Sequence, residues 1–249
     1  PANIPWSEYG VNYVLESTGL FLTRETAQAH LGGTVQKVIL SAPANDDTKT
    51  IVLGVNDSLI EATDIILSNA SCTTNSAAPL VQVLLEMAEI ESAYITTIHS
   101  YTTDQRLHDS PHKDLRRARA AALSIVPTST GAAKALTKIF PQLEGHMGGC
   151  GMRVPVPDGS LTDLTLIVRN PPTVEAINAA FLKASETNLK GILSYTADPI
   201  VSVDIVGNSH SVIFDSQLTS VIGNMVKVVG WYDNEAGYSN RLIDLFEKI

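Results

Sequence analysis

Apolar residues in the first seventy positions form short runs that are separated by helical and turn-forming stretches. The pattern predicts four strands, over residues 13–19, 35–40, 50–55 and 65–67. It also predicts a helix over residues 23–31, with Thr23 as the N-cap and Gly32-Gly33 at its end. Strands that alternate with helices and are apolar almost throughout are typical of a parallel sheet covered on both faces. The first part of the chain is therefore predicted to be α/β, an architecture that often holds a nucleotide or cofactor.

The pattern changes after residue 70. Apolar residues at helical spacing, from Leu80 to Met87, follow the polar stretch Ser71-Cys72-Thr73-Thr74-Asn75 and predict a helix. Cys72 then lies at or just before the helix N-terminus, and Pro79 is expected in the first turn, where its missing N–H costs little. Further helices are expected over residues 132–139, 173–190 and 236–249, with Gly191 capping the second. Strands are expected over residues 94–98, 161–168, 199–206, 211–214 and 225–231. Because strands outnumber helices here, we predict a second, α+β domain with a mostly antiparallel sheet.

Composition and charge exclude several classes of protein. The 249 residues carry 17 Lys+Arg and 26 Asp+Glu, a formal net charge of −9, whereas a general nucleic-acid binder needs a positive surface. A charged fraction of 17% beside an apolar fraction of 44% is the reverse of a disordered composition. No apolar run approaches the roughly 18 residues of a membrane span, and two cysteines cannot build a disulfide framework. A cytoplasmic protein that binds neither nucleic acid nor membrane is expected.

Cys72 is the strongest candidate for a reactive group. The free N–H groups and the dipole of a helix N-terminus stabilise a thiolate, so this position predicts a lowered thiol pKa. A lone cysteine is more often a small buried apolar residue. The neighbours of Cys72 are too polar for that role: Ser71, Thr73, Thr74 and Asn75. Cys150, between glycines, has no such neighbours and is interpreted as structural.

A histidine could serve as the base that deprotonates this thiol. His99 follows the predicted strand over 94–98, and a strand end is a usual place for a catalytic side chain. A lone histidine is nevertheless more often a packed or surface residue. Spacing alone does not select His99 from the other five histidines, which are His30, His108, His112, His146 and His210.

Three cationic or hydroxyl-rich segments are compatible with phosphate binding. Residues 113–119 contain four cations. Such a run is typical of a solvated helix face or of a strip of salt bridges between subunits, and it also suits an anion site. Thr128-Ser129-Thr130-Gly131 precedes the helix predicted over 132–139, where free N–H groups favour an anion. Arg153 is an isolated cation in an apolar setting. Beside Cys72 these segments indicate a thiol enzyme that acts on a phosphorylated substrate. Neither a metal-ligand motif nor a Gly-x-Gly-x-x-Gly or Walker loop occurs in the chain.

Several ordered motifs give the chain a specific resemblance. They are Ala70-Ser71-Cys72-Thr73-Thr74-Asn75, His99-Ser100-Tyr101-Thr102, Asp104-Gln105-Arg106, Asp114-Leu115-Arg116-Arg117-Ala118-Arg119, Pro127-Thr128-Ser129-Thr130-Gly131-Ala132-Ala133-Lys134, Met152-Arg153-Val154-Pro155 and Trp231-Tyr232-Asp233-Asn234-Glu235. In this order they resemble the phosphorylating glyceraldehyde-3-phosphate dehydrogenases over essentially the whole chain. The resemblance implies oxidation of glyceraldehyde 3-phosphate with NAD and inorganic phosphate to 1,3-bisphosphoglycerate, in a homotetramer.

The resemblance also implies roles for individual residues. Cys72 would be the nucleophile that forms a thiohemiacetal and then a thioester, and His99 would be its acid and base. The substrate phosphate would be surrounded by Thr102, Asp104, Arg117 and Arg153. The attacking phosphate would be held by Ser71, Thr73, Thr130 and Gly131. Asn234 and Tyr238 would lie beside the nicotinamide, with Asn234 orienting its carboxamide.

The family's organisation implies two domains. Residues 1–71, completed by the C-terminal helix 235–249, would be a partial dinucleotide-binding domain with an incomplete Rossmann-type parallel sheet, and residues 72–234 the catalytic α+β domain. Roughly 80 residues with the family's dinucleotide fingerprint are expected before Pro1, so the natural protein is expected to be longer. Three features depart from the family pattern, namely Ser76, Ala236 and the dipeptide Ser110-Pro111. Pro111 favours NAD and Ser110 does not, so NADP is not excluded.

Two alternatives stay open at this point, one of the same class and one of another. The first is erythrose-4-phosphate dehydrogenase, which shares the Cys/His pair; Tyr232 and Pro157-Asp158-Gly159-Ser160 favour the glyceraldehyde enzyme instead. The second is a non-catalytic binding paralogue, or a truncated and inactive chain. The complete set of Cys72, His99 and Arg153 argues against loss of the site.

Overall fold

The computed structural model describes all residues from Pro1 to Ile249. The chain forms two compact units, the first of residues 1–71 and 239–249 and the second of residues 72–238. The first contains a parallel sheet and the second a larger mixed sheet with helices. This arrangement confirms the predicted fold class, α/β followed by α+β.

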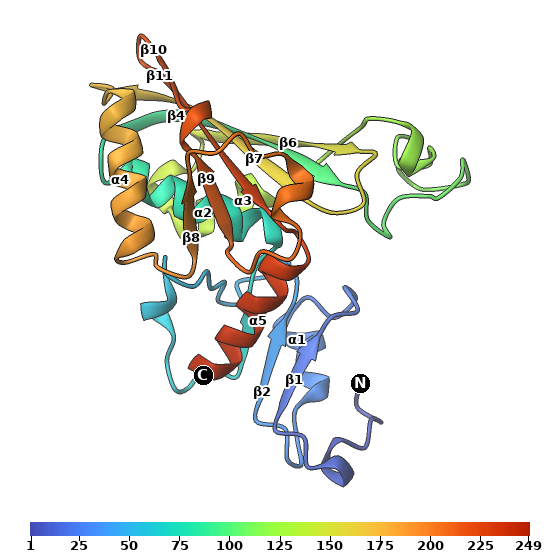
Figure 1. Cartoon of the computed structure of the whole chain (residues 1–249). Helices are drawn as coiled ribbons and strands as arrows, with labels where there is room; N and C mark the ends of the chain where they lie inside the picture. Colours follow the sequence, from blue (N-terminus) through green and yellow to red (C-terminus); the bar gives the residue numbers. More distant parts are fainter. The chain divides into compact units, whose positions relative to one another are not determined.

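The first unit is built on a three-stranded parallel sheet in the order β1-β2-β3 (Figure 1). Its strands are β1 (Tyr13–Glu16), β2 (Lys37–Leu40) and β3 (Ile66–Ser68). The helix predicted after β1 is short: α1 covers Arg24–Ala27 and continues as a 3-10 turn over Gln28–His30. Thr23 is the N-cap of α1, as predicted, because its hydroxyl accepts the N–H of Thr26. Residues of α5 (Ala236–Lys248) from Ser239 onward also belong to this unit.

The strand predicted over residues 50–55 is wrong. Only Thr50 makes an isolated bridge, to Ser68, and the segment that follows is a turn. The Asn56 side chain closes this turn by accepting the N–H of Val52 at 2.7 Å and donating to the carbonyl of Thr50 at 2.9 Å. Gly54 contributes a φ of 79°, which only glycine adopts readily. The apolar residues here are buried in a loop, which periodicity does not distinguish from a buried strand.

The second unit contains an eight-stranded sheet in the order β5-β6-β4-β7-β11-β9-β8, with β10 paired to β11. Every neighbouring pair is antiparallel except β4–β6 and β8–β9. The strands are β4 (Glu89–Ser100), β5 (Val126–Thr128), β6 (Met147–Val154), β7 (Ser160–Arg169), β8 (Leu193–Thr196), β9 (Val212–Asp215), β10 (Ser220–Ile222) and β11 (Met225–Tyr232).

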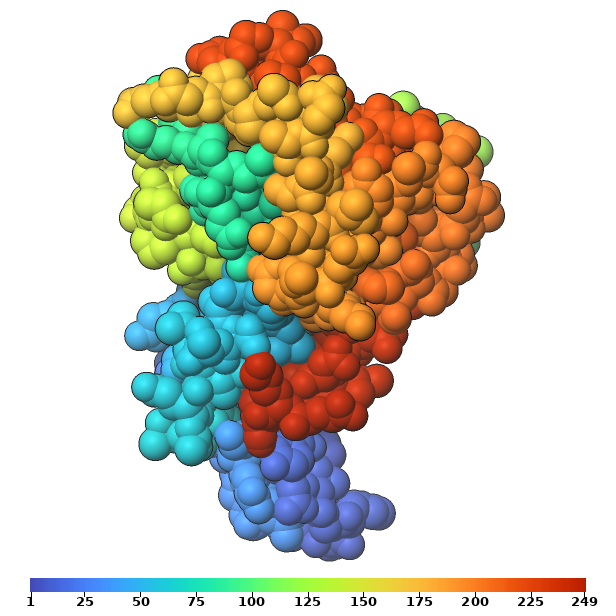
Figure 2. All heavy atoms as spheres, turned by 60° about the vertical axis from the view of Figure 1, so that its left-hand side comes forward, coloured from blue at the N-terminus to red at the C-terminus, as the bar shows by residue number.

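Helices pack on one face of this sheet. They are α2 (Cys72–Leu85), α3 (Ala132–Ile139) and α4 (Val174–Glu186). Figure 1 shows all three on the same side, and Figure 2 shows α4 at the surface. Alternate residues of β4, among them Ile95, Thr97 and His99, are buried, whereas Tyr94 on the other face is half exposed. The face that carries His99 is therefore the helix-covered face, which places His99 near α2.

Three further predictions about this unit need correction. Residues 199–206 are not a strand but contain a 3-10 turn over Ser202–Ile205, stabilised because Asp204 accepts the N–H of Val201 at 2.8 Å. Helix α4 ends at Glu186 rather than at residue 190. Pro79 lies in the interior of α2, not in its first turn, because α2 already begins at Cys72. None of the helices combines the length and apolar character that crossing a membrane requires.

Short 3-10 turns complete the chain. They cover Trp6–Tyr9, Gln28–His30, Asp57–Leu59, Ala121–Leu123, Pro141–Leu143, Ser202–Ile205 and Ser216–Leu218.

Candidate active site

Cys72 and His99 meet at the junction of α2 and β4. Cys72 is the first residue of α2, as predicted, and His99 is the penultimate residue of β4. The Sγ atom of Cys72 lies 3.5 Å from Nε2 of His99, which is within reach of a proton transfer. The structure thus selects His99 from the six histidines. His30, for comparison, lies in the other unit, where it pairs with Glu16 at 2.8 Å.

Arg153 lies on the other side of the His99 ring. The two residues are directly paired in the parallel ladder of β4 and β6, which brings their side chains to the same end of the sheet. Nη1 of Arg153 is 2.6 Å from Nδ1 of His99 and donates to the carbonyl of Ser100 at 2.9 Å. Nδ1 is also 2.8 Å from that carbonyl. A guanidinium only donates, so its contact with Nδ1 suits the tautomer with the hydrogen on Nε2, whereas the contact with the Ser100 carbonyl suits the tautomer with the hydrogen on Nδ1. In the second tautomer Nε2 is an acceptor that faces the thiol.

These surroundings keep His99 neutral. Burial, reinforced by the positive charge of Arg153, lowers the pKa of His99 to about 4. At neutral pH the imidazole is therefore uncharged and is able to accept the proton of Cys72.

The electrostatics of Cys72 differ from the sequence-based prediction. Burial of the thiol is the largest effect and raises its pKa, while hydrogen bonds from Thr73 and the charge of Arg153 oppose that rise. The predicted lowering of the pKa at the helix N-terminus is therefore wrong for the protein in this state, because desolvation outweighs the favourable groups. Cys72 and His99 rest as a neutral thiol and a neutral imidazole.

Asn234 lies in the same unit, two residues after the end of β11. Its Oδ1 atom accepts hydrogen bonds from the hydroxyls of Ser100 at 2.9 Å and Ser160 at 2.7 Å. These two donors fix the orientation of the buried amide, and Ser100 directly follows His99. Tyr238 is the third residue of α5 and is half-buried.

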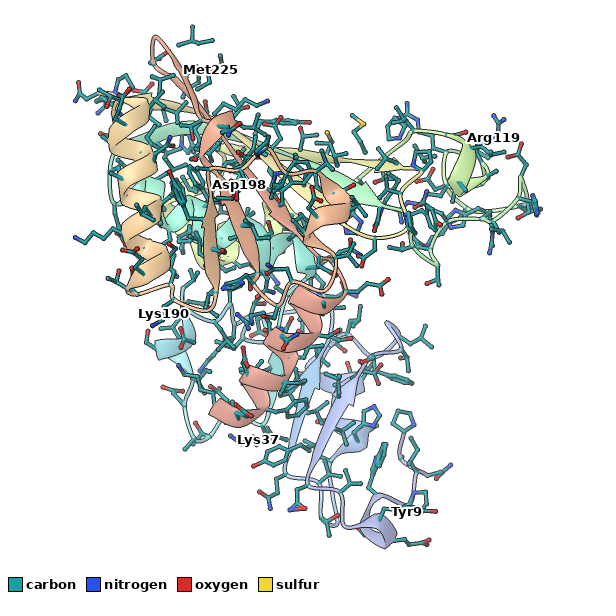
Figure 3. The ribbon with its side chains drawn as sticks, in the orientation of Figure 1. Tyr9, Lys37, Arg119, Lys190, Asp198 and Met225 are labelled. Atoms are coloured by element: carbon teal, nitrogen blue, oxygen red, sulfur yellow. The ribbon has the colours of Figure 1, made fainter.

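The cationic segment 113–119 is not a helix. It forms turns in a long excursion between β4 and β5 that projects from the sheet in Figure 1, and Arg119 in this excursion is labelled in Figure 3. Arg117 is half-buried here, forms an ion pair with the exposed Asp104 and lies 3.4 Å from Asp114. Burial lowers the pKa of Arg153, and the charge of Arg117 acts weakly in the same direction. Guanidinium groups are favourable partners for a phosphate.

The remaining phosphate candidates fall in two places. The half-buried Thr102 donates its N–H to Gln105, at the start of the excursion that carries Asp104 and Arg117. Thr130 accepts the N–H of Ala132 at 3.2 Å, and Gly131 is the N-cap of α3. Ser71 directly precedes α2 and is half-buried, whereas Thr73 is buried with its hydroxyl bonded to Tyr232.

Comparison with known proteins adds an independent observation. The family model described as "Glyceraldehyde 3-phosphate dehydrogenase, C-terminal domain" matches residues 71–234. The chain is 59% identical over 245 residues to a glyceraldehyde-3-phosphate dehydrogenase of Mycobacterium avium, covering 98% of this chain and 72% of that protein. It is 57% identical over 247 residues to glyceraldehyde-3-phosphate dehydrogenase 2 of Streptomyces avermitilis, covering 98% of this chain and 74% of that protein. The chain belongs to the glyceraldehyde-3-phosphate dehydrogenase family.

Two departures from the pattern of the dehydrogenase family have a visible structural setting. Ser76 is fully buried in α2, and its hydroxyl is 2.9 Å from that of Thr162 on β7, so it joins helix and sheet. Ala236 is the first residue of α5, and its N–H donates to Asp233 at 2.7 Å. In this member of the family the Asp233 carboxylate caps α5, and this cap does not depend on the size of the side chain at position 236.

Sequence reasoning missed three supporting residues of this dehydrogenase-family site. Ser100 and Ser160 hold Asn234, and Tyr232 bonds to Thr73 and Thr97. Tyr232 was visible as part of a motif, but its partners lie more than a hundred residues away in the chain. Cys150, interpreted as structural, is half-buried on β6, where Thr96 lies 3.8 Å from its Sγ. No group of three or more His, Cys, Asp or Glu side chains is arranged to hold a metal ion.

Proposed function

We propose that the chain is a glycolytic, phosphorylating glyceraldehyde-3-phosphate dehydrogenase that uses NAD. The contact of 3.5 Å between Sγ of Cys72 and Nε2 of His99, flanked by Arg153, carries this proposal. The identity of 59% to a curated enzyme with that name supports it. In this proposal residues 72–234 form the catalytic domain, and residues 1–71 with 235–249 belong to the dinucleotide-binding domain.

Cys72 is the nucleophile in the proposed reaction. Its Sγ forms a bond to the aldehyde carbon while the thiol proton moves to Nε2 of His99, which then protonates the new oxyanion to give a thiohemiacetal. During the oxidation Nε2 accepts the hydroxyl proton again, and a thioester on Cys72 results. An oxygen of inorganic phosphate attacks the thioester, the C–S bond breaks, and the acyl phosphate leaves while Cys72 recovers its proton.

Asn234 and Tyr238 are the residues of this chain proposed to lie beside the nicotinamide. The amide of Asn234 suits a carboxamide partner, because the hydroxyls of Ser100 and Ser160 hold its orientation before any ligand binds. Nicotinamide supplies the hydride acceptor when it is bound. NAD is proposed over NADP on Pro111 in the loop that follows β4.

Two phosphate subsites are proposed. Thr102, Asp104, Arg117 and Arg153 would bind the phosphate of glyceraldehyde 3-phosphate, and the bidentate donors of the two guanidinium groups support this assignment. Ser71, Thr73, Thr130 and Gly131 would bind the attacking phosphate. For Thr73 the backbone is the available contact, since its hydroxyl is engaged with Tyr232.

A cytoplasmic homotetramer is proposed for the assembled protein. Large aliphatic side chains stand in the excursion between β4 and β5 with most of their surface exposed: Leu107, Leu115, Leu123 and Ile125. A second copy of the chain would cover them. Light scattering on the purified protein should give the mass of four subunits, and a monomer mass would contradict the assembly.

A direct assay of NAD reduction tests the activity. The protein should reduce NAD only when glyceraldehyde 3-phosphate and phosphate are both present, and Cys72→Ser should abolish the reaction whereas Cys150→Ser should not. A higher kcat/KM for erythrose 4-phosphate would replace the substrate assignment. A protein that binds NAD but oxidises neither aldehyde would indicate a binding protein.

A further inference from the structure

We propose that Tyr232 is a positioning residue that sets the distance between Cys72 and His99. Its phenol lies between the two segments that carry this pair, with Oη 3.0 Å from Oγ1 of Thr73 and 2.8 Å from Oγ1 of Thr97. Thr73 directly follows Cys72, and Thr97 is two residues before His99 on the same face of β4. The inference rests on the roles proposed above for Cys72 and His99.

The hydroxyl joins α2 to β4 through two hydrogen bonds. It has a single hydrogen, so it donates to at most one of the two threonine hydroxyls and accepts from at least one of them. All three side chains are buried, with Tyr232 only 1% exposed, so water does not replace either bond. A shift of the first turn of α2 relative to β4 would break one of them.

The ring of Tyr232 adds a second constraint. It packs edge-on against the His99 imidazole with 5.9 Å between ring centroids and an interplanar angle of 79°. Tyr232 itself is held by the antiparallel ladder with β7, where it pairs with Ser160. The same phenol therefore contacts the imidazole plane and, through Thr73, the start of the helix that carries the thiol.

The phenol does not act as an acid or base in this arrangement. Burial raises the pKa of Tyr232 far above its ordinary value, so the group stays protonated at any pH at which the protein is folded. Its hydroxyl is bonded to the two threonines, while Nε2 of His99 is the atom that faces Sγ. Tyr232 thus acts through Cys72 and His99.

Alkylation of Cys72 by iodoacetamide tests the proposal without substrate or cofactor. Peptide mass spectrometry gives the rate at Cys72, and Cys150 in the same sample is the internal reference. Tyr232→Phe keeps the ring and removes the hydroxyl, and it should slow alkylation of Cys72 about tenfold at neutral pH, with Cys150 unchanged. Tyr195→Phe, which removes a phenolic hydroxyl from β8, is the matched control, and its Cys72 should be alkylated at the wild-type rate.

A double-mutant cycle with His99→Asn separates positioning from packing. If Tyr232 acts by placing His99 against the thiol, Tyr232→Phe should have little further effect once His99 is replaced. The same tenfold loss in the His99→Asn background would overturn the proposal and assign Tyr232 to general packing. A wild-type rate of Cys72 alkylation in Tyr232→Phe would also overturn it.

Thr97→Val is the second variant in case Tyr232→Phe does not fold. This substitution keeps the branched shape of the side chain and removes one of the two partners of Oη. Alkylation of Cys72 should be slower than in the wild type, by less than the tenfold expected for Tyr232→Phe. An unchanged rate would count against the proposal. The outcome is separable from the proposed function. If the wild-type protein lacks dehydrogenase activity but the alkylation cycle shows coupling, the function fails and the positioning role stands.

Discussion

Acid destabilisation through His99 is a direct consequence of its burial. The pKa of His99 is lowered from 6.5 to about 4 in the folded protein, with burial the largest cause and the charge of Arg153 the second. Between these two pH values an unfolded chain binds a proton at this position that the folded protein does not bind. Stability is therefore complete above pH 6.5 and falls as the pH decreases towards 4. Below the folded-state pKa the loss is constant.

The size of the effect follows from the two pKa values of His99. Each tenfold difference in proton affinity corresponds to about 1.4 kcal/mol. A difference of about 2.5 pKa units therefore gives a loss of about 3 kcal/mol over the whole window, of which about 2 kcal/mol is reached at pH 5. This is a large share of the roughly 5–15 kcal/mol that stabilises a typical protein.

The measurement compares urea unfolding at neutral pH and at about pH 5 for the wild type and His99→Asn. The variant does not bind the proton, so its loss of unfolding free energy on acidification should be smaller than that of the wild type by about 2 kcal/mol. His146→Asn, at an exposed histidine, is the control and should behave like the wild type. If His99→Asn loses as much stability as the wild type, the buried neutral state of His99 is refuted.

Three further variants test other parts of the structure. Gly149→Ala should lower the free energy of unfolding by about 1–3 kcal/mol, because the added Cβ would lie 2.5 Å from Cγ2 and 2.9 Å from the carbonyl oxygen of Ile95; an unchanged melting temperature would contradict this. Ser160→Ala should raise the KM for NAD about fivefold while the KM for the aldehyde stays constant, because it removes one donor from Asn234; an equal rise in both values would indicate general distortion. Arg117→Met should raise the KM for glyceraldehyde 3-phosphate at least about tenfold and leave Cys72 alkylation unchanged, since a cation beside the phosphate is lost; a slower alkylation would place Arg117 in the thiol site instead.

Local signals predicted several elements well. The start of α2 at Cys72 followed from polar residues before an apolar helical repeat, and α3 has the predicted bounds of Ala132–Ile139. Thr23 caps α1 as expected. These features depend on residues within one or two turns of each other, so a linear pattern contains the information.

The errors arose where burial or a distant side chain decides the conformation. Residues 50–55 are apolar because they are buried, but the side chain of Asn56 closes them into a turn. The segment 199–206 has a similar apolar pattern, and Asp204 turns it into a 3-10 element. Helix α4 ends four residues early, at Glu186, although Gly191 has the positive φ expected near a helix end.

The sequence by itself determined the class of chemistry in this protein. A cysteine among hydroxyl residues at the start of a helix, together with arginine-rich and Thr/Gly segments, indicated a thiol that handles phosphorylated molecules, and the ordered motifs indicated the family. Only the tertiary structure chose His99 from six histidines and placed Arg153 against it. The structure also changed the expected state of Cys72 from a stabilised thiolate to a neutral thiol. The physical reason is that desolvation and hydrogen bonding depend on which strands and helices enclose a group, and in this site those elements come from distant parts of the chain.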